Sequence, residues 1–131
     1  MIVDAGMNDL IRPALYGAYH AIVPVAEALP EAERVVVDVV GPICESGDTF
    51  ARGRALPRVK AGDLLAFRTA GAYGAAMAST YNARAVPAEV MVNGADFAVV
   101  GDRSGIADWL RRQHLAPWME PRAVAPSQAS L

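Results

Sequence analysis

The sequence lacks the features that mark membrane, secreted and nucleic-acid-binding proteins. One cysteine among 131 residues excludes a disulfide within the chain, so we expect a reducing compartment, the cytoplasm. No apolar run approaches the roughly 18–20 residues that span a membrane. The start of the chain shows no basic region followed by an apolar stretch, the pattern of a signal peptide. Basic residues neither outnumber acidic ones nor form runs, which argues against a nucleic-acid surface.

Lysine and histidine are also scarce. Lys60 is the single lysine beside eleven arginines, and it lies in a turn-like stretch, residues 57–63, where we expect a solvated side chain. No glycine-rich loop leads into a helix start of the kind that holds a phosphate. His20 and His114 are too isolated in the sequence to indicate a metal site or acid–base work. The chain therefore has no obvious means of its own to hold a cofactor covalently or to bind a metal.

What is present fits one mainly β domain. The length and the 53% hydrophobic content allow a core. The run of β-branched residues at 35–40 predicts a buried strand, and 64–69 predicts a second. Asn93-Gly94 predicts a tight turn with positive φ at both central residues, between strands at 85–91 and 97–100. We expect a small closed or nearly closed β structure over residues 1–116, and a flexible tail over 117–131.

Short helices are expected at both ends of this β structure. Asn8 or Asp9 is suited to cap a helix that continues over 14–22, with Gly17 as its weak point. Ser104 is suited to cap a second helix, whose apolar face consists of Ile106, Trp109 and Leu110.

Three stretches concentrate the residues that could carry chemistry: 4–16 (DAGMNDLIRPALY), 41–48 (GPICESGD) and 71–74 (GAYG). In this order they resemble the motifs of diaminopimelate decarboxylases, pyridoxal-phosphate enzymes of the alanine-racemase-like fold type. The resemblance covers about residues 2–92 and the C-terminal domain only. It implies a β-barrel like the alanine racemase C-terminal domain, packed beside a TIM-type barrel domain that carries the cofactor lysine.

Cys44 is the candidate catalytic residue. A lone cysteine is most often a small buried hydrophobe, but its place in a loop beside Glu45 favours exposure. A neighbouring carboxylate also disfavours the thiolate, which suits a proton donor more than a nucleophile. The resemblance implies that Cys44 reprotonates the carbon that loses carbon dioxide, and that Glu45 binds the distal amine of the substrate. Asp48 is predicted to be structural, its side chain capping its own turn.

Arg12, Tyr16 and Tyr73 are the remaining candidate site residues. Arg12 and Tyr16 are four residues apart, which places them on one face of a helix. Taken alone, Arg12 and Tyr16 favour a surface arginine stacked on a tyrosine, and the glycines around Tyr73 also occur at ordinary bulges. The resemblance implies that Arg12 and Tyr16 bind substrate, since a guanidinium suits a carboxylate. It also implies that Tyr73 contacts both substrate and cofactor.

The function implied by the resemblance belongs to a complete enzyme. That enzyme converts meso-2,6-diaminopimelate to L-lysine and carbon dioxide with pyridoxal 5′-phosphate, as a homo-oligomer in which the Cys44–Glu45 loop reaches the partner's site. The isolated chain is expected to be inactive. Two alternatives stay open: a sister decarboxylase for ornithine, arginine or lysine, in which aspartate typically follows the cysteine, and a non-catalytic assembly module.

Overall fold

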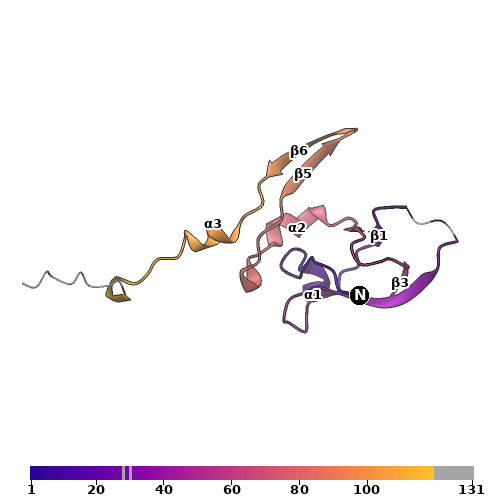
Figure 1. Ribbon diagram of the computed structural model, residues 1–131, viewed down its shortest axis with the longest axis horizontal. Coiled ribbons are helices and arrows are strands. Elements are labelled where there is room, and N and C mark those ends of the chain that lie inside the picture. The colour runs from indigo at the N-terminus through magenta and orange to yellow at the C-terminus, as the bar shows by residue number, and fades with distance from the viewer. Residues whose placement is uncertain (28, 30, 120–131) are drawn as a thin grey trace, which may run out of the picture.

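A computed structural model describes residues 1–27, 29 and 31–119 of the chain (Figure 1). Strands provide most of the regular structure, and the helices are short. In chain order the elements are α1 (Arg12–Tyr16), β1 (Ile22–Pro24), β2 (Arg34–Val40), β3 (Thr49–Pro57), β4 (Leu65–Phe67), α2 (Gly71–Met77), a 3-10 turn (Tyr81–Ala83), β5 (Glu89–Asn93), β6 (Asp96–Gly101), α3 (Ile106–Leu110) and a 3-10 turn (Pro117–Met119).

The strands form three antiparallel pairs: β1 with β4, β2 with β3, and β5 with β6. The mainly β architecture with short helices is confirmed. Within residues 1–27, 29 and 31–119, however, the pairs do not join into one continuous sheet. Closure into a barrel therefore stays a prediction.

The pair β2–β3 forms the longest ladder. The predicted strand at 35–40 is confirmed, because its β-branched residues suit a pleated surface. The prediction that this strand is buried is wrong, because only Val39 is buried and Val36 is exposed. β3 was not predicted, since its sequence is rich in arginine and small residues. Asp38, the polar residue within the apolar run of β2, has a partner in β3. The amide of Gly53, at φ +55°, donates to Asp38 Oδ1 at 2.7 Å. This contact lies at the register shift between Val37 and Val39, where the ladder departs from regular pairing.

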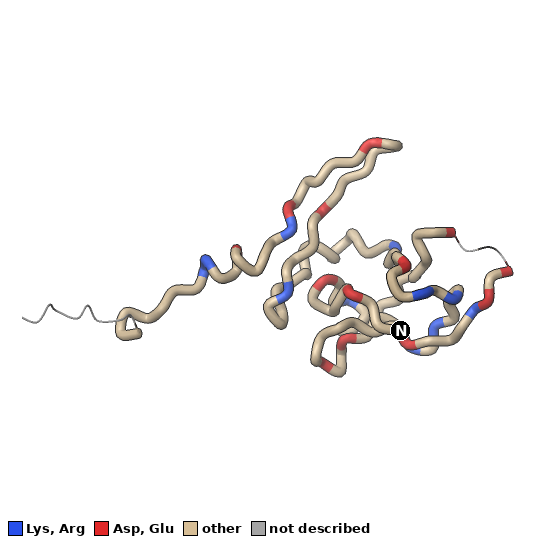
Figure 2. The backbone as a smooth tube through the Cα atoms, in the orientation of Figure 1, with Lys and Arg blue, Asp and Glu red and all other residues tan. Residues whose placement is uncertain are grey.

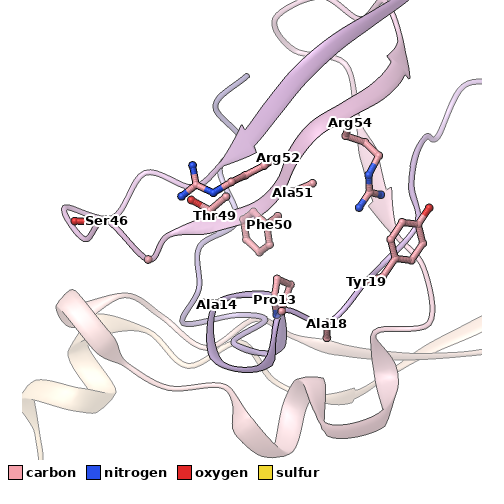
Figure 3. A pocket seen from close by; sticks show the side chains of 12 residues that line it. Pro13, Ala14, Ala18, Tyr19, Ser46, Thr49, Phe50, Ala51, Arg52 and Arg54 are labelled. Carbon is pink, nitrogen blue, oxygen red and sulfur yellow. The ribbon is translucent and has the colours of Figure 1, made fainter.

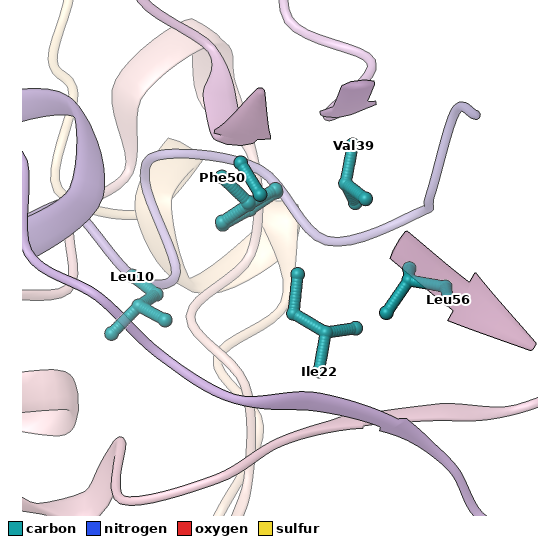
Figure 4. Packing of buried hydrophobic residues seen from close by; sticks show 6 residues of the cluster. Leu10, Ile22, Val39, Phe50 and Leu56 are labelled. Carbon is teal, nitrogen blue, oxygen red and sulfur yellow. The ribbon is translucent and has the colours of Figure 1, made fainter. Parts of the chain in front are cut away.

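A small core lies where β1, β3 and the N-terminal segment meet (Figure 4). The rings of Phe50 and Phe67 approach to 4.7 Å between centroids. Val39 is completely buried, and the N-terminus is tied to its strand because Val3 N donates to Val40 O at 2.9 Å. This core fixes β1 and β3, the strands next to the candidate site. Its buried members are Leu10, Ile22, Val39, Phe50, Ala51 and Leu56.

Two helix predictions at the N-terminal end are wrong. The helix does not continue over 14–22: it ends at Gly17, which adopts a left-handed conformation at φ +63°, and Ile22 already begins β1. Asn8 and Asp9 do not cap it either, because the N-cap position is Ile11. Their side chains make other contacts, described below.

The hairpin β5–β6 projects from the body of the molecule (Figure 1) and carries few charges along its length (Figure 2). It is confirmed as a hairpin, but Asn93 pairs with Asp96, so the turn consists of Gly94 and Ala95. Only Gly94 has positive φ, at +61°, so the prediction of two such residues is wrong. Its apolar side chains are exposed to solvent: Val90, Met91, Val92, Phe97, Val99 and Val100.

The C-terminal helix α3 differs from its prediction at its cap. Gly105, not Ser104, is the N-cap residue. The Ser104 hydroxyl instead accepts a hydrogen bond from Val86 N at 2.9 Å, which joins the two ends of the hairpin. Of the predicted flexible tail, residues 117–119 form a 3-10 turn, and 120–131 lie outside the described residues.

Candidate functional site

Arg12 lies between two tyrosines from different parts of the chain. Its guanidinium carbon is 5.6 Å from the ring centroid of Tyr16 and 5.3 Å from that of Tyr73. Cations over aromatic rings are held by the ring quadrupole at such distances. Both tyrosines remain more than half exposed, whereas Arg12 is partly buried. The structure therefore brings three of the predicted site residues into one cluster, in which a positive charge is oriented at a solvent-accessible surface.

Tyr73 reaches Arg12 from an unusual backbone. The segment α2 is kinked, and Tyr73 has φ +65°, a conformation that a bulky side chain rarely adopts. No residue of α2 is buried, although Ala70 just before it packs against the core. The place of Tyr73 is therefore set by how the ends of α2 are anchored, since α2 itself buries nothing.

Cys44 and Glu45 lie on the loop 41–48 between β2 and β3. Both side chains are exposed, which confirms the expected exposure of the thiol. Glu45 Oε1 accepts a hydrogen bond from Gly47 N at 3.0 Å, so the carboxylate is oriented by its own turn. In the described part of the chain, none of the hydrogen bonds of Cys44 or Glu45 reaches Arg12, Tyr16 or Tyr73.

Asp48 fixes the shape of this loop. Its buried carboxylate accepts hydrogen bonds from Ile43 N and from Met7 N, both at 2.7 Å. The predicted structural role is confirmed, but the side chain joins the loop to the N-terminal segment as well as closing it. Gly41 leaves room for it, because a Cβ there would stand 2.3 Å from Asp48 Oδ2. The loop that carries Cys44 is thus fastened to the segment that leads into α1.

Residues of α1 and of strand β3 line a cavity of about 370 Å³ (Figure 3). Pro13 and Ala14 of α1, with the capping residue Gly17, form one wall, and Ser46 and Gly47 of the loop form another. Arg12 and Tyr16 lie on the face of α1 that meets Tyr73, so the helix has the aromatic cluster on one side and the cavity on another.

The described residues offer only part of a cofactor site. Tyr73 presents an exposed phenol beside a cation, which fits a contact at the edge of a pyridine ring or substrate. Lys60 does not belong to the cluster: it is exposed in a turn, where its amide donates to Asp63 Oδ2 at 2.7 Å. No group of three metal-ligating side chains exists among residues 1–27, 29 and 31–119. Over the same residues, no helix is long and apolar enough to cross a membrane.

Two residues near the site were given lesser roles by the sequence. Asn8 was expected to be a helix cap, and Arg84, in the stretch Asn82-Ala83-Arg84, was expected to have a structural role. Asn8 is 2% exposed, and its Oδ1 accepts a hydrogen bond from Arg84 Nε at 2.9 Å. The sequence feature nearest to these contacts is the pair Asn8-Asp9 just before the Arg12 motif. Its position ahead of a helix is typical of a cap, so it did not indicate a contact with Arg84.

Comparison with known proteins places the fold and the motifs in one family. Residues 1–71 match the family described as pyridoxal-dependent decarboxylase, C-terminal sheet domain. A diaminopimelate decarboxylase of Zymomonas mobilis is 50% identical over 119 residues, which are 91% of this chain and 28% of that protein. The chain thus spans little more than a quarter of this relative.

Solved structures show the same relationship. A diaminopimelate decarboxylase from M. jannaschii, in complex with L-lysine, superposes with a TM-score of 0.83 at 39% identity, covering 91% of this chain and 27% of that one. A lysine/ornithine decarboxylase from Vibrio vulnificus, complexed with cadaverine, is more distant: its TM-score is 0.53 at 28% identity, covering 63% of this chain and 22% of that one.

Proposed function

Since this chain belongs to the pyridoxal-dependent decarboxylases, as their C-terminal sheet domain, we propose that it completes the active site of a diaminopimelate decarboxylase. The whole enzyme would convert meso-2,6-diaminopimelate to L-lysine and carbon dioxide in the cytoplasm. The observation that carries the proposal is the cluster of Arg12, Tyr16 and Tyr73, in which motif residues far apart in the sequence meet around one cation. Support for the substrate comes from 50% identity to a diaminopimelate decarboxylase, against 28% to a lysine/ornithine decarboxylase.

The substrate has a second amino-acid end that survives the reaction, and the residues of this chain suit it. The guanidinium of Arg12 can form paired hydrogen bonds with the distal carboxylate. Because the two tyrosine rings already restrict the side chain of Arg12, it loses less conformational entropy when substrate binds. Glu45 has one oxygen on its own turn, and its exposed carboxylate can accept hydrogen bonds from the distal ammonium. One cation and one anion therefore recognise one zwitterionic end.

The chemistry at the other end of the substrate needs pyridoxal phosphate, which, when bound, withdraws the electron pair left behind by carbon dioxide. Tyr73 would contact both that cofactor and the substrate. Cys44 then acts at a single atom: its Sγ–H donates a proton to the carbon from which carbon dioxide departs. The cofactor lysine would come from a TIM-type barrel domain outside this chain, and the chain alone is expected to be inactive.

Cys44 and Glu45 are exposed and, among the described residues, form no hydrogen bond with the Arg12 cluster, so they are free to serve a homodimeric site. In this arrangement the loop 41–48 of one subunit reaches the Arg12, Tyr16 and Tyr73 of its partner. The apolar side chains of β5–β6 are exposed, and large exposed apolar surfaces usually contact another domain or subunit. We propose that the TIM-type barrel domain of the same enzyme covers them.

Mixed dimers test this arrangement. Complete subunits carrying Cys44→Ala are combined with subunits whose cofactor lysine is replaced by alanine. If Cys44 acts in the partner's site, random reassortment restores one intact site in half of the dimers, about a quarter of wild-type activity. If Cys44 acts in its own subunit, no mixed dimer contains an intact site, and activity stays at the level of the parents.

The distal-ammonium role of Glu45 is tested by Glu45→Asp, which keeps the charge but shortens the side chain by one methylene. Loss of a charge-assisted hydrogen bond costs about 1.5–3 kcal/mol, so we expect kcat/KM for meso-diaminopimelate to fall at least about tenfold. Glu31→Asp, at another exposed glutamate, is the matched control and should change little. Equal kinetics for the two variants would remove Glu45 from the substrate site.

A further inference from the structure

Arg12 and Tyr73 meet although neither of their segments is deeply buried. α1 and α2 contain no buried residue. The segment 71–77 forms no strand pairing, and its first anchor is Ala70, which packs on the core. A second anchor is needed after α2, because Tyr73 is held at φ +65° in a conformation that would otherwise relax.

That second anchor is a set of polar contacts centred on Asn8 and Arg84, here named the Asn8–Arg84 bridge. Ser79 N donates to Asn8 O at 2.9 Å, and Asn8 Nδ2 donates to Ser79 O at 3.3 Å. Arg84 Nε donates to Asn8 Oδ1 at 2.9 Å. Arg84 Nη2 donates to Asp4 O at 2.5 Å and lies 3.7 Å from Asp9 Oδ2.

The bridge joins the two segments that carry the site. Asn8 and Asp9 come just before the helix of Arg12, and Ser79 follows the helix of Tyr73. Asn8 uses its side-chain acceptor for Arg84 and its side-chain donor for Asp9 and Ser79, so its buried polar groups are satisfied. Such a fully bonded buried amide fixes geometry better than surface contacts do.

Backbone strain beside Arg84 gives independent support. Asn82 and Ala83 both have φ +56°, and the second of these is unfavourable for a residue with a Cβ and no side-chain hydrogen bond. Conformations of this kind persist where surrounding contacts determine them, and they concentrate near functional sites. Here the contacts that follow the strained residues are those of Arg84.

We propose that Asn8 and Arg84 are positioning residues, which set the distance between Arg12 and Tyr73 and thereby the affinity for the substrate's distal carboxylate. The inference rests on the proposed function for its substrate. The effect of Asn8 and Arg84 passes through Arg12 and Tyr73, and neither of the two touches the reacting atoms. Their loss should therefore raise KM more than it lowers kcat.

The first experiment measures backbone opening and needs no activity. Hydrogen exchange of residues 71–78 is followed by mass spectrometry in the complete protein, for wild type, Arg84→Ala and the milder Asn8→Asp. We expect exchange there to accelerate at least about tenfold in Arg84→Ala, because the variant loses a charge-assisted hydrogen bond to the buried Asn8. Arg58→Ala is the matched control: it removes an exposed arginine that pairs with Glu33 at 2.7 Å, away from α2. Unchanged exchange over 71–78 in Arg84→Ala would overturn the proposal whatever the enzyme's substrate.

The second experiment is a double-mutant cycle on KM with Arg12→Ala and Arg84→Ala in the complete enzyme. If Arg84 acts through Arg12, KM rises about tenfold in Arg84→Ala alone, but adding Arg84→Ala to Arg12→Ala changes KM little. A general loss of folding would instead lower kcat and multiply the two effects. Multiplied effects on KM, or a fall in kcat alone, would overturn the positioning role. If wild type has no activity on meso-diaminopimelate, the proposed function fails while the exchange result still decides the bridge.

Discussion

Replacing Cys44 with alanine in the complete enzyme is expected to lower kcat by about 10²–10⁴, the usual contribution of a positioned general acid. KM for meso-diaminopimelate should change little, because a proton donor acts in the transition state and not in holding the substrate. The exposed position of the thiol on the loop 41–48 is consistent with access to a partner's site. Steady-state kinetics of the purified variant measure both constants.

Ser46→Ala is the matched control for Cys44→Ala. Ser46 lies on the same exposed loop, two residues away, and lines the cavity beside α1. Its loss should leave kcat near the wild-type value. Near-normal turnover in Cys44→Ala would mean that the thiol is not the acid, and equal losses in both variants would indicate a disturbed loop.

The second large effect is expected at Asp48. In Asp48→Ala, the amides of Met7 and Ile43 lose the carboxylate that accepts their hydrogen bonds. The bond from Ile43 is buried, and the bond from Met7 is partly buried. The unpaired buried amide costs about 1–3 kcal/mol and the lost partly buried bond about 0.5–1.5 kcal/mol, so the free energy of unfolding should fall by about 1.5–4.5 kcal/mol. Urea unfolding monitored by circular dichroism measures this as a lower midpoint with an unchanged slope.

Asp63→Ala is the matched control, which shows how much stability is lost when an exposed aspartate is removed. Asp63 also accepts a backbone hydrogen bond at 2.7 Å, but in an exposed turn where water can replace it. Its loss should cost about 0.5–1.5 kcal/mol. If Asp48→Ala were no more destabilising than Asp63→Ala, the carboxylate of Asp48 would not be what fastens the loop.

The sequence predicted those elements whose residues have a strong local preference for one secondary structure. The β-branched run of β2 and the turn glycine of β5–β6 are examples. β3 escaped prediction because its strand conformation depends on pairing with β2 and on the contact of Gly53 with Asp38. The helix expected over 14–22 failed because the left-handed Gly17 ends α1 and leaves Ile22 for β1.

The site shows the same division. The spacing of Arg12 and Tyr16 predicted that the two share a helix face, and they do stack. That Tyr73 joins them could not follow from spacing, since it depends on a strained backbone anchored at both ends. Asn8 was taken for a cap because its partners, Ser79 and Arg84, lie 71 and 76 positions away.

We expect the Arg12 cluster and the loop 41–48 together to select a substrate with a distal amino-acid end. This selectivity is measured as the ratio of kcat/KM for meso-diaminopimelate to that for L-ornithine, determined on the complete enzyme carrying this domain. The distal carboxylate of diaminopimelate adds a charge-assisted contact of about 1.5–3 kcal/mol that ornithine cannot make. We expect the ratio to exceed about tenfold in favour of diaminopimelate and to collapse in Arg12→Ala. A ratio of one or below in the wild-type enzyme would contradict the claim.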